Sequence, residues 1–207
     1  LDNELRLQSA AVNKAVAVFG EGRDTLIRID AHGEYGADFI WQLLREARTS
    51  GADAVVIRMT SVGQTCLQKA IAVAQNSVLG NGGSAHRLAG EGRWVEHGHH
   101  ALIRIAAFRR AGGYDPTFSH NEDAEFDIRL ARAGGRIWLT GATSMLYFPR
   151  RTLSSLFRQY ANYGRGRART LLKSGIRPRL RQMAMQMVFP VVSLAVLTPV
   201  WPWFVLP

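Results

Sequence analysis

The uneven distribution of charge along the 207 residues is the feature that most constrains what this chain can fold into. All sixteen acidic residues lie at or before Asp127, together with thirteen Lys or Arg, which gives this part a net charge of about −3. After Asp127 there are thirteen basic residues and no acidic one, and after Arg181 there is no charged side chain. A single evenly charged globular domain is therefore excluded. We expect three parts, which are residues 1–150, 151–181 and 182–207.

The basic and apolar parts together are typical of the flank of a membrane segment. Residues 182–207 are rich in Met, Val, Leu, Phe and Trp, and their length is close to the roughly 20 apolar residues that a spanning helix needs. Lys and Arg are enriched on the cytoplasmic side of such segments. We therefore expect association with the inner membrane, with the rest of the chain facing the cytoplasm, and no nucleic-acid partner. A buried pair of terminal helices is the alternative for residues 182–207.

The order of apolar runs before residue 150 predicts an α/β fold with a mostly parallel sheet. Helical spacing is found over residues 5–18, 38–50, 66–79, 106–111 and 124–133. Strand-like runs cover residues 25–29, 54–59, 136–139 and 145–148. Residues 152–173 predict a basic amphipathic helical stretch, interrupted at Gly164 and Gly166. The single cysteine, Cys66, excludes an internal disulfide and a cysteine-rich zinc site.

Asp30 and His32 come directly after the predicted strand 25–29. In open α/β sheets ligands bind at the carboxyl ends of strands, where a carboxylate can reach a divalent ion such as Mg²⁺ or Mn²⁺. A turn-capping role for Asp30 is the alternative. His97 and His99 would point the same way on a strand, but no cysteine or acidic pair nearby completes a separate zinc site.

Glu122 and Asp123 follow a Gly-Gly turn and open the predicted helix 124–133. Acidic side chains are favoured at a helix N-terminus, so simple capping would explain both. The alternative to capping is a catalytic role in which Glu122 or Asp123 acts together with a second carboxylate, that of Asp30. One carboxylate near a metal and another that accepts a proton from a hydroxyl group are the minimum equipment for an inverting transfer reaction.

The order of these motifs resembles glycosyltransferase family 2, in particular its membrane-bound succinoglycan-type glucosyltransferase branch. Residues 28–32 (Arg-Ile-Asp-Ala-His) are similar to the family's strand ending in a variant of Asp-x-Asp. Residues 107–115 resemble its Arg-Arg segment before Gly-Gly-Phe-Asp, residues 121–123 its x-Glu-Asp motif, and residues 134–139 the strand that follows. The likeness covers almost the whole chain.

This resemblance implies a Rossmann-like nucleotide-sugar fold of the type called GT-A. It also implies a Mg²⁺ or Mn²⁺ ion held by Asp30 and His32 with the donor diphosphate, Asp123 as the general base, and inversion at the anomeric carbon. The expected donor is a UDP-sugar, and the expected acceptor is lipid-linked or a polysaccharide of exopolysaccharide or cell-envelope synthesis. The acceptor and substrate region would include His99, His100, Arg109, Arg110, Glu122, Gln159, Tyr163 and Arg165. A basic surface helix that contacts lipid phosphates is the alternative for Gln159, Tyr163 and Arg165. Solvated helix charges are the alternative for Arg109 and Arg110.

Two departures from the family pattern matter. The chain opens on Leu1 like the interior of a longer protein, and the nucleotide-binding third that begins the family's catalytic domain is expected to be missing. A non-catalytic membrane-anchored remnant of the same fold is therefore the alternative to an enzyme. Processive members carry Gln-x-x-Arg-Trp, whereas residues 159–165 read Gln-Tyr-Ala-Asn-Tyr-Gly-Arg. This difference predicts the addition of one sugar rather than polymerisation.

Overall fold

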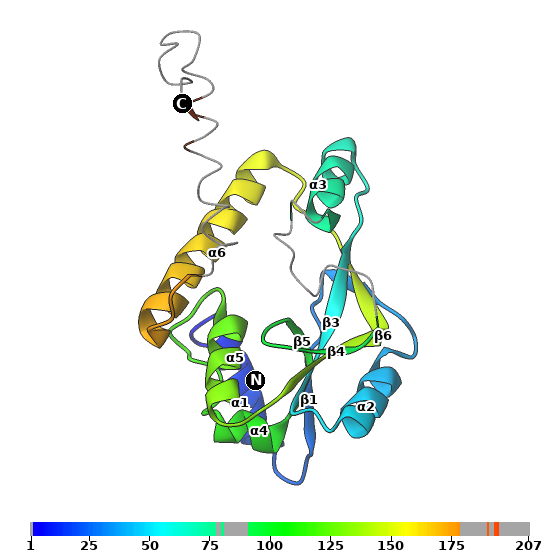
Figure 1. Cartoon of the computed structure of the whole chain (residues 1–207), viewed down its shortest axis with the longest axis vertical. Coiled ribbons are helices and arrows are strands. Elements are labelled where there is room, and N and C mark those ends of the chain that lie inside the picture. Colours follow the sequence, from blue (N-terminus) through cyan, green and yellow to red (C-terminus); the bar gives the residue numbers. More distant parts are fainter. Residues whose placement is uncertain (1, 78–79, 81–90, 179–189, 191–192, 195–207) are drawn as a thin grey trace. The chain divides into compact units, whose positions relative to one another are not determined.

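The computed structural model describes residues 2–77, 80, 91–178, 190 and 193–194. The chain divides into two compact units, residues 1–174 and 175–207. The first unit holds all the helices and strands discussed below, and in it one mixed sheet is covered by helices (Figure 1).

The helices of this unit are α1 (Gln8–Phe19), α2 (Phe39–Ser50), α3 (Cys66–Asn76), α4 (Ile105–Arg110), α5 (Glu122–Arg132) and α6 (Leu153–Ser174). Its strands are β1 (Thr25–Ile27), β2 (Gly33–Tyr35), β3 (Ala54–Ser61), β4 (Arg93–Val95), β5 (His99–Arg104) and β6 (Ile137–Tyr147). Every predicted helix is present with small shifts at its ends. The predicted strands 136–139 and 145–148 are one continuous strand, β6, and β2, β4 and β5 were not predicted.

The prediction of a mostly parallel sheet is wrong for the described residues. The strand order is β1-β5-β3-β6-β2, and β4 pairs with β6. Of these pairs β3 and β6 run parallel, whereas β1–β5, β3–β5, β2–β6 and β4–β6 are antiparallel. The reversal involves β5, which lies between β1 and β3 and runs antiparallel to both. The α/β class itself agrees with a Rossmann-like fold.

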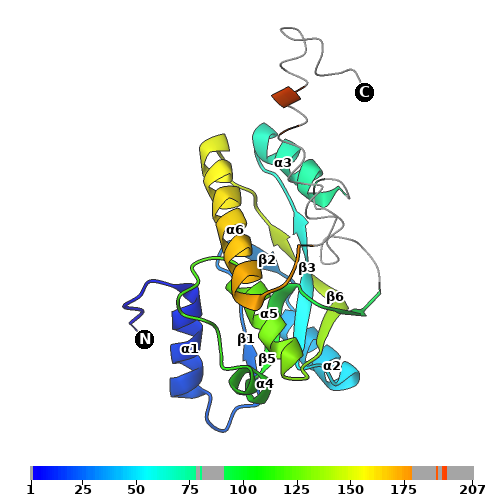
Figure 2. The ribbon, with the colours of Figure 1, turned by 60° about the vertical axis from the view of Figure 1, so that its left-hand side comes forward.

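Helices cover both faces of the sheet because successive side chains of β3 point to opposite faces. Val56 packs with Phe108, Phe126 and other residues of one cluster, formed with α1, α4 and α5. Val55 packs with Leu43 and other residues of the second cluster, formed with α2. Figure 2 shows α2 on the side of the sheet opposite α5.

Helix α6 is unbroken, so the predicted interruption at Gly164 and Gly166 is wrong. Gly166 is buried, and a Cβ atom there would lie 2.6 Å from the backbone oxygen of His120 and 2.9 Å from the Cβ of Asn121. Asn121 also donates a 2.7 Å hydrogen bond to the hydroxyl of Thr170. The absence of a side chain at Gly166 therefore lets α6 contact the segment that leads into α5.

Among the described residues no helix is long and apolar enough to cross a membrane. The predicted membrane segment, residues 182–207, lies outside the described residues except for Pro190, Ser193 and Leu194.

The two glycines of α6 give a matched test of this packing. A Cβ at Gly164 would meet nothing within 4 Å. We expect Gly164→Ala to raise the free energy of unfolding by about 1 kcal/mol, because alanine is the better helix former. Gly166→Ala should instead lower it, by on the order of 1–3 kcal/mol, because the methyl group overpacks against backbone. Thermal and urea unfolding of both variants measures this, and equal stabilisation by the two would contradict the contact.

Candidate active site

Asp30 lies just past the carboxyl end of β1, as predicted. The backbone N–H of Arg28 donates to the carbonyl of Ala101 (2.8 Å), which continues the pairing of β1 with β5. This pairing brings the Nε2 atom of His99 to 3.3 Å from Oδ2 of Asp30. The hydrogen bond from His99 holds the pKa of Asp30 below its usual value although the carboxyl group is partly buried. Asp30 is therefore ionised at neutral pH.

Arg28 joins the two acidic motifs of the sequence. Its Nε lies 3.8 Å from Oδ1 of Asp30, and its Nη1 lies 3.8 Å from Oε1 of Glu122. The side chains of Arg28, Asp30 and Glu122 are 11%, 14% and 10% exposed, so the cluster opens only narrowly to solvent. The structure thus places the strand-end carboxylate beside the start of α5.

The start of α5 is fixed by an unusual backbone. Asn121 precedes Glu122 in the left-handed conformation, with φ of 64°, and its side chain makes no capping hydrogen bond. The carboxylate of Asp123 accepts a 2.8 Å hydrogen bond from the backbone N–H of Ala124. Asp123 therefore satisfies one of the N–H groups that a helix start leaves without a partner, in line with the capping interpretation.

The two carboxyl groups of this motif have opposite pKa shifts. Burial raises the pKa of Asp123, but the neighbouring charges of His97, His100 and Arg28 outweigh it and lower the value to about 2. Burial and the charge of Asp123 raise the pKa of Glu122. Asp123 is therefore the carboxyl group of the motif that is more firmly held in its ionised form.

A buried chain of hydrogen bonds lies beside this motif. Asp127, whose side chain is 1% exposed, has Oδ2 at 2.6 Å from Nδ1 of His97 and Oδ1 at 2.6 Å from Nε2 of His100. A carboxylate only accepts, so both imidazoles donate to it. Nδ1 of His100 lies 2.9 Å from the hydroxyl oxygen of Tyr114. The same hydroxyl oxygen accepts from Nη1 of Arg28 at 3.4 Å. The chain links β1 to α5.

The interpretation that His97 and His99 point the same way is wrong. Strand β5 begins at His99, so His97 precedes it and turns to Asp127, while His99 turns to Asp30. The side chain of His100 is fully buried, and it contacts the site through Asp127.

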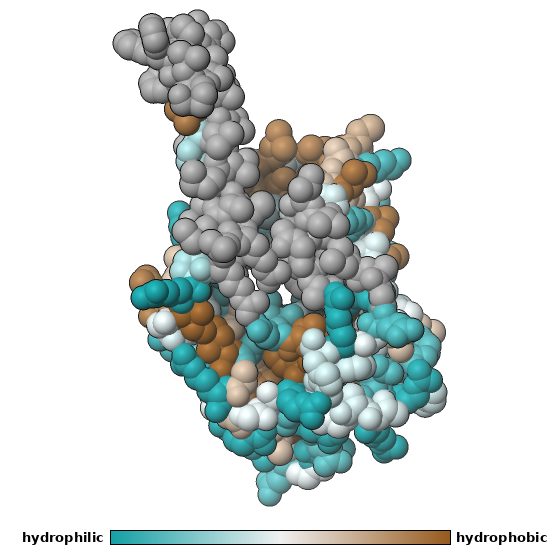
Figure 3. All heavy atoms as spheres, viewed as in Figure 1, coloured by the Kyte–Doolittle hydropathy of each residue, from teal (hydrophilic) through white to brown (hydrophobic). Residues whose placement is uncertain are grey.

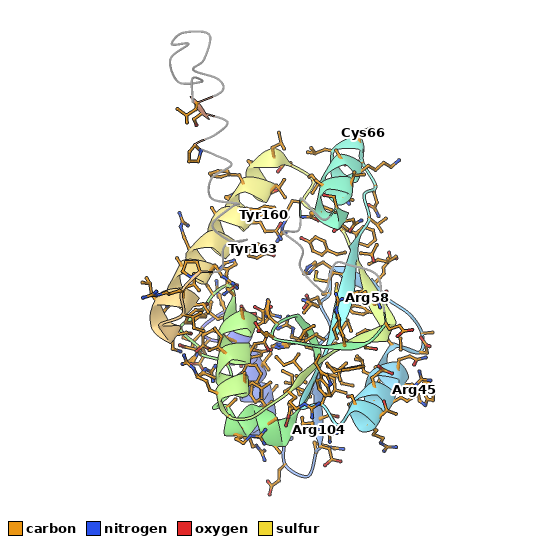
Figure 4. The ribbon with its side chains drawn as sticks, in the orientation of Figure 1. Arg45, Arg58, Cys66, Arg104, Tyr160 and Tyr163 are labelled. Atoms are coloured by element: carbon orange, nitrogen blue, oxygen red, sulfur yellow. The ribbon has the colours of Figure 1, made fainter. Side chains whose placement is uncertain are left out.

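Helix α6 carries three of the predicted substrate-region residues, Gln159, Tyr163 and Arg165. Nε2 of Gln159 donates to the hydroxyl groups of Tyr147 (2.9 Å) and Tyr163 (2.8 Å). Figure 4 shows Tyr163 on the side of α6 that is turned toward the sheet. Burial, helped by nearby negative charge that includes Asp123, raises the pKa of Tyr163. Arg165 is exposed and contacts its helix neighbour Asn162, so the structure brings Gln159 and Tyr163 toward the site but leaves Arg165 at the surface.

Arg109 and Arg110 lie at the opposite end of the sheet. Both are exposed on α4, and Nη2 of Arg110 is 3.0 Å from Oδ1 of Asp53, which precedes β3. Strand β5 runs from His99 beside Asp30 to Arg104 at this far end (Figure 4). The structure therefore does not bring the two arginines together with the other predicted residues.

His32 lies beside the cluster and lines a pocket of about 490 Å³ together with Gln64, Gln68, Arg150, Arg151 and other residues. Its ring contacts Tyr147 edge-on, with 5.8 Å between centroids. Among residues that the structure describes, no group of three or more His, Cys, Asp or Glu side chains could hold a metal ion. Mg²⁺ is commonly held by one or two carboxylates plus substrate phosphates, and the ionised Asp30 fits that mode.

Comparison with known proteins gives a clear relative. Over 191 residues the chain is 59% identical to the succinoglycan biosynthesis protein ExoA of Rhizobium meliloti (strain 1021), an alignment that covers 92% of this chain and 58% of that protein. The resemblance to the succinoglycan-type branch is confirmed. The chain thus spans little more than half the length of this relative. No protein-family model matches the chain.

Sequence reasoning gave no role to three residues that hold the site together, Arg28, Tyr114 and Asp127. A signal existed for Asp127, because it follows Asp123 by four residues and so shares its helix face. No comparable signal exists for the pairing of Asp127 with His97 and His100, since these residues lie on a different element.

The His97–Asp127 pair should make the stability of the fold depend on pH. Burial lowers the pKa of His97, but the hydrogen bond and charge of Asp127, with Asp123, raise it overall above its usual value. A raised folded-state pKa contributes stability that is complete below the unfolded value of about 6.5 and is lost as pH rises through the folded value.

We therefore expect the melting temperature to fall as pH rises from 6.5, and this component of the fall to be absent in His97→Gln. His32→Gln is the control for loss of an imidazole away from Asp127, and this variant should keep the component that His97→Gln removes. Identical pH profiles in His97→Gln and the parent protein would contradict the assignment.

Proposed function

We propose that this chain is the catalytic part of an inverting glycosyltransferase of succinoglycan-type exopolysaccharide synthesis. The observation that carries the proposal is the meeting of Asp30 with Glu122 and Asp123 around Arg28. The similarity to a succinoglycan biosynthesis protein supports it. These acidic motifs lie far apart in the sequence, and helix capping alone gives no reason for them to converge.

The proposed reaction is a direct displacement at the anomeric carbon of the donor sugar. The acceptor oxygen forms the new bond to that carbon while the bond to the nucleoside diphosphate breaks, and the acceptor's proton passes to Asp123. With a pKa of about 2, Asp123 is ionised at neutral pH and able to accept this proton. Glu122 is the competing base, since its raised pKa makes it intrinsically the better proton acceptor.

Metal dependence is part of the proposal. Asp30 would hold a Mg²⁺ or Mn²⁺ ion, with His32 and His99 nearby, and the ion would neutralise charge on the departing diphosphate. In this proposal Asp30 holds the ion on the side of the leaving diphosphate, and Asp123 accepts the proton on the side of the acceptor. A UDP-sugar donor, a lipid-linked or polysaccharide acceptor and the addition of a single sugar complete the proposal.

An attachment to the inner membrane is also proposed. Helix α6 exposes Leu153 (66%) and Phe157 (75%) one turn apart, next to basic side chains such as Arg158. Figure 3 shows hydrophobic side chains gathered over α6 and α3. An apolar stripe with basic neighbours is the pattern of a helix that lies at a membrane surface.

We expect the full-length protein to stay in the membrane pellet after extraction with alkaline carbonate, because residues 182–207 would anchor it. Release of the intact protein into the soluble fraction would contradict anchoring by residues 182–207. The protein would then contact the membrane only at its surface.

The base is tested by Asp123→Asn in the full-length protein. Asn keeps the shape of the side chain and can still accept from the N–H of Ala124, but it cannot take the acceptor's proton. Loss of a general base typically costs on the order of 10²- to 10⁴-fold in rate. We expect a loss of sugar transfer of at least that lower bound, with a melting temperature close to that of the parent protein.

Two variants serve as controls in the same assay of radiolabelled sugar transfer. Glu122→Gln should retain most activity, and a comparable loss only in this variant would move the base to Glu122. Asp30→Ala should abolish the response of turnover to Mn²⁺ or Mg²⁺. A parent protein with no transfer at all would favour a non-catalytic remnant.

A further inference from the structure

The guanidinium group of Arg28 has far fewer partners than its burial requires. It carries five N–H donors, yet the only hydrogen bond of this side chain among the described residues is the 3.4 Å contact of Nη1 with Tyr114. Its Nε is buried without a hydrogen-bond partner. Asp30 and Glu122 each approach to 3.8 Å, which is beyond hydrogen-bond distance. A buried polar group that stays unsatisfied in a native fold requires an explanation.

A purely structural role does not supply that explanation, as a second arginine of the same sheet shows. Arg104, on β5, donates from Nε to the carbonyl of Ala52 and from Nη2 to the carbonyl of Ala47, both at 2.8 Å. These two bonds tie β5 to the end of α2 and the start of β3. The guanidinium of Arg28 makes no contact of this quality, although its side chain is only 11% exposed.

The charge of Arg28 is secure in this setting. A guanidinium does not lose its proton in proteins, and the carboxylates of Asp30 and Glu122 each lie 3.8 Å from it. The group is therefore a permanent cation with open donors, and its side chain is 11% exposed. A planar guanidinium with several donors suits the oxygen atoms of a phosphate group, which it can bind in a forked geometry.

We infer that Arg28 binds a phosphate group of a substrate directly through its guanidinium. This inference rests on the proposed function, which gives the site a phosphate-bearing ligand. The phosphate has two possible sources, the diphosphate of a nucleotide-sugar and the phosphate of a lipid-linked acceptor. Asp30 lies beside Arg28. A divalent ion held by Asp30 and the guanidinium of Arg28 would therefore bind the same phosphate-bearing ligand.

Arg28→Lys tests the inference without removing the charge between the two carboxylates. Lysine keeps the cation but loses the forked donors. Binding of pyrophosphate and of uridine diphosphate, each as its magnesium complex, is measured by calorimetry on the full-length protein. Magnesium is included because a bare diphosphate would be repelled by Asp30 and Glu122. Calorimetry with a short-chain polyprenyl phosphate in detergent micelles tests the second source.

We expect Arg28→Lys to weaken binding of at least one of these phosphates by tenfold or more, as loss of a charge-assisted hydrogen bond does. A loss with pyrophosphate and uridine diphosphate assigns the donor, and a loss restricted to polyprenyl phosphate assigns the acceptor. Arg104→Lys is the matched control, which should lower the melting temperature and leave phosphate binding unchanged.

Unchanged binding of all three probes in Arg28→Lys overturns the inference, even if sugar transfer by the parent protein is intact. An equal loss in Arg28→Lys and Arg104→Lys overturns it as well, because a general disturbance of the sheet then explains both. A parent protein that binds uridine diphosphate through Arg28 but transfers no sugar would instead refute the proposed function and leave the inference standing.

Discussion

The two short hydrogen bonds to the buried carboxylate of Asp127 are the interaction on which the site depends. Burying an ionised carboxylate is costly unless strong hydrogen bonds compensate it, and His97 and His100 provide them at 2.6 Å each. Asp127 belongs to α5, whereas the two histidines belong to the start of β5 and the residues before it. The bonds therefore fix where α5 lies along the sheet. They also fix where Asp123, one turn earlier on the same helix, meets the end of β1.

The parts of the fold that local sequence determines were predictable. Helix α2 ends at Ser50 because Gly51 takes the left-handed conformation with φ of 65°, and α3 begins after Thr65 with a capping box completed by Gln68. The start of α5 and the strand-end position of Asp30 follow from equally local patterns. Strand directions do not, because β5 is only six residues long and its neighbours β1 and β3 are chosen by contacts across the whole unit.

The candidate site shows the same division between local and distant information. Asp30, Glu122 and Asp123 were identified from their own neighbours in the sequence, and the structure brings them together around Arg28. Arg109 and Arg110 looked equally suitable, but a local charge pattern does not say at which end of a sheet a helix will lie. Asp127 escaped notice because its partners are 27 and 30 residues away, and no spacing rule connects a helix to a strand over that distance.

The contact at Gly166 has a consequence for how the site can respond to its surroundings. Asn121 is held from one side by α6, through Gly166 and Thr170, and from the other by its own left-handed backbone, which few non-glycine residues adopt. It is followed within two residues by Asp123. A small sliding or rotation of α6 would therefore displace the carboxylate of Asp123, because the backbone between them is constrained. A contact made on the exposed surface of α6 would then change the position of Asp123 relative to the other residues of the site.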